Sequence, residues 1–383
     1  RICVRYECVP MRFIKHVYKI HTYAQDGCLF EGKTPVSAFL NSSYDGSFIA
    51  GLMELRYIQS LPVERIINYF ESHGFTLKKP TAHKLMEKAS SLFENLYKCI
   101  RQTALSDPYK AADETYYKIL VPEKNSKGKG VRKGYLWVVV GINTRMIYLL
   151  YDDGSRSEKV ILNELGGCKG IIQSDGYSPY RKLESDAYPH ITRIPCLQHI
   201  KRKFIDCGED DPDAKRIVEM INTLYQNEHK HKIGVDGWTV EQNLVHRKKY
   251  APDILGEIKD VLDDIEERGD LLPKSELKEA ITYLRNEWNA VVDIFNYGDT
   301  YLDNNIVERM NRYISLSRKN SLFFGSHKGA ERGAILYTIA LTCRMNKVNL
   351  FEYLTDIINR TAEWQPNTPL EKYRQLLPDR WND

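Results

Sequence analysis

The chain has 383 residues, of which 42% are hydrophobic and 28% charged, with a formal net charge of +4. This composition indicates a folded globular protein of more than one domain and excludes a disordered chain. The longest apolar run, around 136–142, is far short of the roughly 18 residues of a membrane span, so no membrane association is expected.

No basic and apolar leader opens the chain, and the eight cysteines form no close pairs, a pattern typical of a reducing cytoplasm. The chain begins with Arg1 and not with Met, which favours a start further upstream.

Residues 46–105 are predicted to be helical. Apolar spacing predicts one helix over 52–61 and a second over 63–73, with Gly74 as its stop and Thr81 as the N-cap of a third. This is the outline of a helix-turn-helix, although many helical hairpins that bind no DNA share it. The expected front of the recognition helix is basic, with Lys78, Lys79 and Lys84 as DNA-binding candidates.

Residues 106–205 are predicted to alternate between strands and helices. Strands are expected over 114–120, 134–142, 145–151, 170–174 and 191–195, and helices over 158–165, 178–185 and 197–205. Three antiparallel strands followed by alternating helix and strand is the order of a ribonuclease-H-like core, so we predict an α/β fold with such a mixed sheet. Residues 206–296 are predicted as a helical insertion and 297–345 as the second part of the core, with helices over 302–318 and 335–345. Residues 346–383 are predicted as a helical tail.

Basic residues gather in three segments although the total charge is small. Residues 118–133 hold six basic residues and one acid, Lys201, Arg202 and Lys203 are consecutive, and residues 309–332 hold six basic residues against Glu331. Such clusters can neutralise phosphates even where acids elsewhere cancel the total, while a solvated surface is the alternative for any single cluster.

Two carboxylates are expected at neighbouring strands of the core. Asp113 is placed where the first strand begins, and Asp175 where the fourth ends, followed by Gly176, which would allow close approach of backbone and substrate. Because these two strands are neighbours in a ribonuclease-H-like sheet, the two carboxylates could share a metal ion. Taken alone, the Asp-Gly pair is an ordinary turn.

A third carboxylate, Glu308, lies on a predicted helix. The apolar residues of 306–314 fall on one side of a helical wheel, whereas Asn304, Glu308 and Arg312 fall on the other, with Asp303 as the expected N-cap. Such a stripe suits a metal and a phosphate together, and a solvated helix face is the alternative.

Phosphoryl transfer to a hydroxyl nucleophile needs charge neutralisation and an in-line geometry, which two Mg²⁺ ions about 3.5–4 Å apart provide. Asp113, Asp175 and Glu308, in this strand, strand and helix order, are the predicted catalytic residues and ligands of the two ions. Mn²⁺ could substitute for Mg²⁺.

Short motifs over about residues 50–357 resemble those of the insertion sequence 66 family of transposases. The matching motifs are Ala112-Asp113-Glu114-Thr115, Ser174-Asp175-Gly176-Tyr177, Cys196-x-x-His199, Arg202-Lys203-Phe204, Leu272-Pro273-Lys274-Ser275, Asp303-Asn304-Asn305-x-x-Glu308-Arg309, Arg318-Lys319-Asn320, Phe324-Gly325-Ser326 and Glu331-Arg332.

The resemblance implies a ribonuclease-H-like fold with an Asp-Asp-Glu triad, and a transposase that cleaves element ends and joins the 3′-hydroxyl to target DNA. It also implies double-stranded DNA with terminal inverted repeats as substrate, a homo-oligomer on that DNA, small accessory proteins, and a location in the bacterial cytoplasm or nucleoid. Residues 1–45 would be the remnant of an N-terminal region. The expected DNA-backbone contacts are Lys201, Arg202, Lys203, Arg309, Arg312, Arg318 and Lys319, and the expected supporting residues are Gly176, His199, Asn304, Asn305 and Asn320.

The chain departs from the family in two places. Leu197 replaces an aromatic residue inside Cys196-x-x-His199, and Cys3, Cys8, His21 and Cys28 lack the spacing of an N-terminal zinc site. Cys196 and His199 are interpreted as a buried cysteine and a hydrogen-bonded or phosphate-facing histidine.

Two alternative functions remain open. A DNA-binding protein derived from a transposase would lack activity, and a ribonuclease or junction resolvase could share the core. A zinc hydrolase is disfavoured because the chain has no His-Glu-x-x-His motif.

Overall fold

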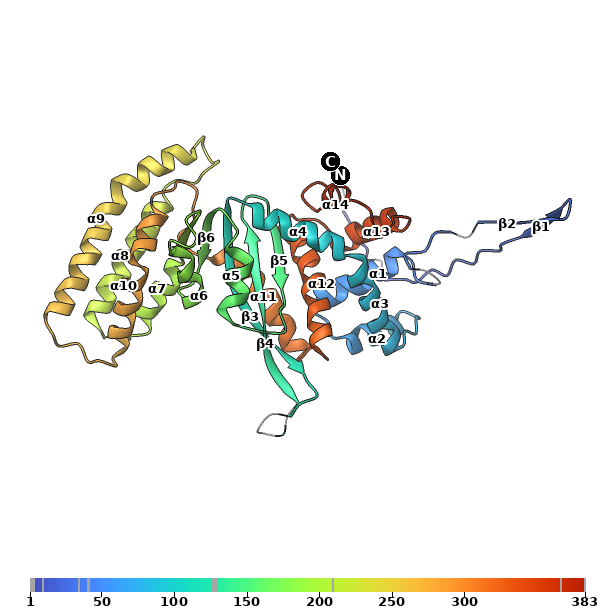
Figure 1. Ribbon diagram of the computed structural model, residues 1–383, viewed down its shortest axis with the longest axis horizontal. Helices are drawn as coiled ribbons and strands as arrows, with labels where there is room; N and C mark the ends of the chain where they lie inside the picture. The colour runs from blue at the N-terminus through green and yellow to red at the C-terminus, as the bar shows by residue number, and fades with distance from the viewer. Residues whose placement is uncertain are drawn as a thin grey trace. The chain divides into compact units, whose positions relative to one another are not determined.

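The computed structural model describes residues 4–8, 10–33, 35–39, 42–124, 128, 130–208, 210–365 and 367–381 (Figure 1). Internal contacts divide the chain into two compact units. The first, called the helical unit, comprises Arg1–Ile100, Tyr117–Arg132 and Tyr313–Asp383. The second, called the sheet unit, comprises Arg101–Tyr116 and Lys133–Arg312.

A five-stranded mixed sheet has the order β5-β4-β3-β6-β7. The strands are β3 (Tyr109–Leu120), β4 (Val131–Gly141), β5 (Met146–Leu150), β6 (Gly170–Ser174) and β7 (Ile191–Pro195). β4 and β5 are antiparallel, whereas β3 with β6 and β6 with β7 are parallel. The predicted α/β class is therefore confirmed, and the first and fourth strands of the core are neighbours as expected.

Strand β3 begins five residues before the predicted start at 114, so Asp113 lies inside the strand and not at its beginning. The early part of β3 was missed because Lys110 interrupts the apolar pattern. Lys110 is nonetheless fully buried, since its ammonium group donates to the carbonyl oxygens of Asp107 and Lys169. Satisfied donors of this kind allow a lysine inside a core strand.

The helices that connect the core strands lie close to their predicted positions. Helices α5 (Glu158–Leu165) and α7 (Leu197–Ile205) have the predicted bounds, as do strands β6 and β7. The segment predicted as one helix over 178–185 is α6 (Ser178–Arg181) followed by a 3₁₀ turn (Lys182–Glu184). Leu197, the family departure, is buried in the core beneath α7.

Three helices follow the core strands, as predicted for residues 206–296. They are α8 (Pro212–Glu228), α9 (Val240–Glu267) and α10 (Glu276–Ile294), and the side chains of Asp211, Thr239 and Ser275 cap their N-termini. Helix α8 packs against α7 and α9, while α10 packs against α7 and β7 (Figure 1). Through α10 the helical segment therefore contacts the edge strand of the sheet.

Helix α11 (Asn305–Asn320) begins three residues after the predicted position. Asp303 does accept a hydrogen bond from a backbone amide, that of Asn305 at 3.1 Å, but Asn304 is the residue that precedes the helix. The predicted start at 302 was too early because Leu302 is buried in the loop that leads to α11.

The helical unit contains a hairpin of β1 (Thr22–Gln25) and β2 (Cys28–Glu31) and a group of packed helices. Helix α1 (Gly46–Tyr57) packs against α3 (Lys79–Leu92), α12 (His327–Met345) and α13 (Leu350–Thr361), and α2 (Val63–Ser72) packs against α3 (Figure 1). The remaining helices are α4 (Glu94–Ser106), which the two units share, and α14 (Leu370–Arg374).

Three predicted helix ends in this unit can be compared with the structure. Gly74 ends α2 with a φ of 80°, as predicted. Thr81 is not an N-cap, because α3 already begins at Lys79, with Lys78 at the cap position. Helix α12 begins at His327 and not at 335, because the Ser326 side chain accepts from the amide of Gly329 and caps the earlier start.

None of the described helices combines the length and the apolar character needed to cross a bilayer.

Candidate active site

Asp113 lies in β3, and Asp175 directly follows the last residue of β6, the parallel neighbour of β3 in the sheet unit. The register pairs Ala111 with Gln173, and continued by two residues it brings Asp113 level with Asp175. Both residues are half-buried, and the Asp175 charge contributes to a raised pKa of Asp113. The structure therefore brings the first two predicted acids together.

Asp113 is an acid whose charge is poorly compensated. Burial raises its pKa to about 8, and the neighbouring Glu114 and Asp175 add to the rise. Two neutral groups donate to its carboxylate: the amide of Glu114 at 2.8 Å and the Asn311 side chain at 2.6 Å. These donors orient the carboxylate without neutralising it.

Glu114, next to Asp113, has a different environment. Its side chain is 5% exposed, forms an ion pair with Arg156 and accepts from the Tyr180 hydroxyl at 3.4 Å. Because Arg156 pairs with the Glu114 carboxylate, we interpret Glu114 as a structural residue beside Asp113 and Asp175. Glu114 is part of the motif Ala112-Asp113-Glu114-Thr115, but no role was predicted for it. In the sequence, its place next to Asp113 was the sign that it could belong to the site.

The backbone around Asp175 is held by a buried ionic network that sequence reasoning missed. Arg193, on β7, donates to the Asp175 carbonyl oxygen at 2.8 Å. The same guanidinium, fully buried, pairs with Glu287 of α10 at 2.5 Å and with Glu184. Buried charges of this kind require partners, so removing Glu287 would leave Arg193 with a large desolvation cost.

Gly176 was expected to leave room for substrate, but a protein side chain occupies that space. A Cβ atom at this position would lie 2.5 Å from the Tyr283 hydroxyl oxygen. The Gly176 amide donates to the same oxygen at 2.8 Å. Tyr283 belongs to α10, so this helix contacts the Asp175 loop at two points: Tyr283 directly and Glu287 through Arg193.

Glu308 lies on the first turn of α11, between two anchors. Before it, the Asn304 side chain donates to the Ala112 carbonyl oxygen at 3.0 Å; after it, Asn311 donates to Asp113. Both anchors reach consecutive residues of β3, so the Glu308 turn is fixed against the strand that carries Asp113. Asn304, predicted on the polar stripe of the helix as a supporting residue, is 2% exposed because it precedes the helix and points into the sheet.

The carboxylate of Glu308 lies beside Cys196 and His199. Its Oε1 is 3.7 Å from His199 Nε2, and one possible ligand atom from each of the three residues lies within 4.8 Å of the others. Cys196 is buried, as predicted, and burial raises the pKa of its thiol to about 12. His199 is half-buried.

The oxygen-rich part of this site fits a divalent cation such as Mg²⁺. Asp113 and Asp175 supply carboxylate oxygens, and a cation would offset the burial and the repulsion between carboxylates that raise the Asp113 pKa. The Oδ1 atoms of Asn304 and Asn311 are buried without a hydrogen-bond partner in the described part of the chain, so two further oxygen acceptors lie next to the acids.

The predicted basic residues divide between the two units. On α7, Arg202 and Lys203 are exposed and Lys201 is half-buried, with Lys201 and Lys203 each 5.9 Å above a tyrosine ring, Tyr225 and Tyr283. Arg309 and Arg312 are exposed on α11 in the sheet unit, whereas Arg318 and Lys319 belong to the helical unit.

The other predicted residues belong to the helical unit. Lys78, Lys79 and Lys84 are exposed on α3, and Lys79 pairs with Glu64 at 2.7 Å. The Asn320 side chain donates to the Ser60 carbonyl oxygen at 3.2 Å within the helical unit.

Asn305 is described, whereas parts of two further predictions fall on residues without described placement. Asn305, described and exposed, contacts Asp303 through its backbone. Of the basic segment 118–133, residues 125–127 and 129 lie outside the described residues, as does Cys3 of the considered zinc site.

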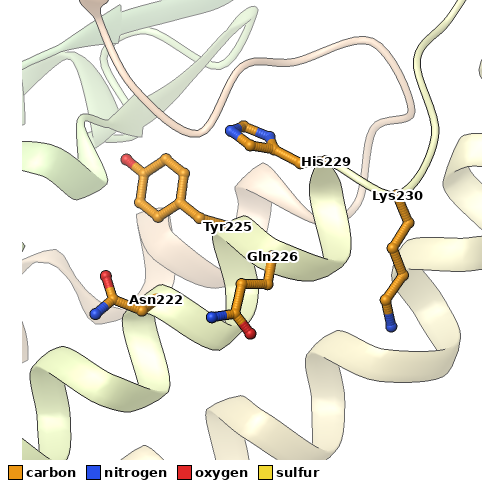
Figure 2. A pocket seen from close by; sticks show the side chains of 5 residues that line it. All are labelled: Asn222, Tyr225, Gln226, His229 and Lys230. Carbon is orange, nitrogen blue, oxygen red and sulfur yellow. The ribbon is translucent and has the colours of Figure 1, made fainter.

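A hollow of about 460 Å³ runs along the last two turns of α8 (Figure 2). Its lining consists of Asn222, Tyr225, Gln226, His229 and Lys230. These residues include no carboxylate, so the hollow does not supply the ligands that Mg²⁺ prefers. The acids on β3, β6 and α11 are the better candidate for metal-dependent chemistry.

With this geometry in view, comparison with known proteins gives the family. A family model described as "Transposase IS66 family" matches residues 41–332, which include the strands of the sheet, all three acids and the helices inserted before Glu308. The chain belongs to this family of transposases.

Three relatives from Sinorhizobium fredii are each named as an uncharacterized protein. They are y4jD, 25% identical over 346 residues; y4hP, 24% identical over 400 residues; and y4qI, 26% identical over 396 residues. The matches cover 87%, 98% and 99% of this chain. They cover 65%, 69% and 70% of the relatives, so the chain spans about two thirds of their length.

Proposed function

We propose that the protein is a DNA transposase that cleaves phosphodiesters at the ends of its element and joins the freed 3′-hydroxyl to target DNA. The pair of Asp113 in β3 and Asp175 at the end of the neighbouring β6, with the Glu308 turn fixed to β3 by Asn304 and Asn311, carries this proposal. Family membership and the five-stranded mixed sheet, whose strand order is compatible with the expected ribonuclease-H-like core, support it.

Asp113, Asp175 and Glu308 would hold two Mg²⁺ ions. Bound there, Mg²⁺ would activate the attacking oxygen and stabilise charge on the leaving oxygen. The protein's own contribution is positioning: Asn311 orients the Asp113 carboxylate, and Arg193 and Tyr283 fix the backbone around Asp175. No covalent bond between protein and DNA is required.

The substrate of this activity would be double-stranded DNA with terminal inverted repeats. Lys201, Arg202 and Lys203 on α7, with Arg309 and Arg312 on α11, are the proposed backbone contacts in the sheet unit, because they carry positive charge on the two helices that hold His199 and Glu308. Lys78, Lys79 and Lys84 on α3, with Arg318 and Lys319, are proposed contacts of the helical unit. Synapsis of two ends would require a homo-oligomer on DNA. Small accessory proteins are further proposed partners, and the first assay is run without them.

Strand cleavage and strand transfer on a duplex that carries the element's own terminal repeat test this proposal. We expect both activities to require Mg²⁺ or Mn²⁺ and to be lost in Asp113→Asn, Asp175→Asn and Glu308→Gln, with DNA binding retained. Asp186→Asn, which changes an exposed aspartate, is the matched control and keeps its activity.

Near-normal cleavage by one of the three variants would remove that residue from the triad. Tight binding to the repeat with no cleavage by the wild type, even after the accessory proteins are added, would instead favour a DNA-binding protein derived from a transposase.

A further inference from the structure

We propose that Cys196, His199 and Glu308 form a binding site for a transition-metal ion of the Zn²⁺ class, distinct in ligand chemistry from the Mg²⁺ site of the acids. Ligand atoms of these three residues already lie within 4.8 Å of one another. A thiol sulfur, an imidazole nitrogen and a carboxylate oxygen are the atoms that Zn²⁺ binds in proteins. Cys196 and His199 are not among the proposed Mg²⁺ ligands, so the two sites share only Glu308.

The backbone holds the three residues in place before any ion binds. Cys196 and His199 are one turn apart at the start of α7, and Glu308 is on the first turn of α11. Two hydrogen bonds tie these segments together: the Leu197 amide donates to the Leu302 carbonyl oxygen at 2.9 Å, and the Asn304 amide donates to Cys196 Sγ at 3.2 Å. One bond is made by the Cys196 sulfur itself and the other by Leu197, the residue after it, so the start of α7 is held against the segment that leads to Glu308 before an ion binds.

The separations suit a small tetrahedral ion after modest side-chain movement. Ligand atoms about 2.0–2.3 Å from a shared Zn²⁺ ion lie roughly 3–4 Å apart. The Nε2–Oε1 distance is 3.7 Å, and both side chains are 33% exposed, which leaves them able to adjust and leaves the ion a path from solvent. Three protein ligands and one open position describe a site that can exchange its ion.

The chemistry of the ligands selects the ion. A thiolate is a soft ligand that favours Zn²⁺ or Co²⁺ over Mg²⁺. His199 Nδ1 is buried and has no hydrogen-bond partner among the described residues, so no hydrogen bond at that nitrogen opposes a small movement of the ring toward an ion. Binding would displace the Cys196 proton to solvent, leaving a thiolate on the metal, and no redox step is involved.

A consequence follows for the proposed transposase, and it rests on that proposed function. An ion held by Cys196 and His199 takes the Glu308 carboxylate, which the Mg²⁺-dependent reaction would need. Zn²⁺ should therefore compete with Mg²⁺ for Glu308 and inhibit cleavage.

Titration of the metal-free full-length chain with Co²⁺ tests the site without any DNA reaction. We expect a thiolate-to-cobalt charge-transfer absorption and the strong visible bands of a tetrahedral site, both displaced by Zn²⁺. Cys196→Ser should remove the charge-transfer absorption, whereas Cys207→Ser, which changes a cysteine outside the cluster, should retain it. An unchanged charge-transfer absorption in Cys196→Ser would overturn the proposal.

His199→Gln is the second variant, because His199 is half-buried and its replacement spares the buried thiol. His199→Gln and Glu308→Gln, each as a single variant, should weaken Co²⁺ binding at least tenfold and leave the circular dichroism spectrum unchanged. Co²⁺ affinity equal to wild type in both variants would also overturn the site. If the Co²⁺ spectra are as expected but Zn²⁺ does not slow DNA cleavage by an active enzyme, the metal site is supported and the competition for Glu308 is refuted. If the wild type cleaves no DNA, the proposed function is contradicted, and the Co²⁺ spectra alone decide whether the metal site exists.

Discussion

Asn311 of α11 donates a hydrogen bond of 2.6 Å to the carboxylate of Asp113 on β3, across 198 residues of sequence. The bond joins the helix of the third acid to the strand of the first. Asn311 is buried and three residues after Glu308, so it lies almost one helical turn along from the third acid. One amide thus sets both the orientation of Asp113 and the place of the Glu308 turn.

Asn311→Ala is expected to lower Mg²⁺-dependent cleavage by about 10–100-fold, the range typical of a lost partner of a metal ligand. DNA affinity should remain, and a higher Mg²⁺ concentration should restore part of the rate, because the carboxylate persists but is no longer oriented. Cleavage rates measured across a Mg²⁺ series check this expectation. Asn296→Ala, an exposed control, should match wild type; an Mg²⁺ dependence in Asn311→Ala identical to wild type would contradict the positioning role.

Asp113→Asn is expected to stabilise the metal-free protein while it abolishes activity. The folded-state pKa of Asp113 is raised to about 8 from 3.8, so ionisation is disfavoured in the fold, and the wild type should lose stability as pH rises between these values. The amide removes this loss, with a gain on the order of 1–3 kcal/mol near pH 8 after allowance for the partial exposure of the group. Urea unfolding in EDTA at several pH values measures it.

With Mg²⁺ present the order of stability should reverse, because the cation binds the folded wild type and stabilises it by mass action. Asp186→Asn should show neither effect. A lower metal-free stability for Asp113→Asn than for wild type at pH 8 would contradict the uncompensated charge.

Gly176→Ala is expected to destabilise the fold by about 1–3 kcal/mol, as over-packing does elsewhere. The new Cβ would collide with the Tyr283 hydroxyl, which must move and give up the bond from the Gly176 amide. A double-mutant cycle with Tyr283→Ala checks the cause: the two changes together should cost less than their sum. Strict additivity would mean that the tyrosine is not what excludes a side chain at 176.

Arg202→Gln is expected to weaken DNA binding by a similar factor for all sequences. Each lost phosphate contact lowers the slope of log affinity against log salt by about 1. Binding measured over a salt series with the terminal repeat and with an unrelated duplex checks both statements. Lys259→Gln removes an exposed charge from α9 and serves as control. A selective loss for the terminal repeat would indicate base contact and would contradict a backbone role.

The parts of the fold with strong local signals could be predicted from the sequence. Strands β6 and β7 are short apolar runs, and α5 and α7 carry helical periodicity, so their bounds were predicted correctly. The beginning of β3 could not be predicted because the buried Lys110 makes it look exposed, and its partners are the carbonyl groups of Asp107 and Lys169. Only the folded chain reveals such compensation.

The same limit applies to the site. The three acids could be proposed because each stands in a recognisable motif, and the structure brings Asp113 and Asp175 together. Arg193 and Glu287 are 94 residues apart, in an ordinary strand and an ordinary helix, and nothing in either segment signals the other. The burial of Asn304 against β3 could not be predicted, because the helical wheel that placed it on a polar stripe was extended one residue before the helix begins.

The contact of α10 with the Asp175 loop has a consequence for how this chain and its relatives can diverge. A guanidinium at 193, a carboxylate at 287 and a phenol at 283 form a set in which the loss of one member leaves another buried without its counterpart. We therefore expect the three positions to be exchanged together among relatives. A chimaera that takes the helices of a distant relative should need position 193 from the same donor to remain folded and active.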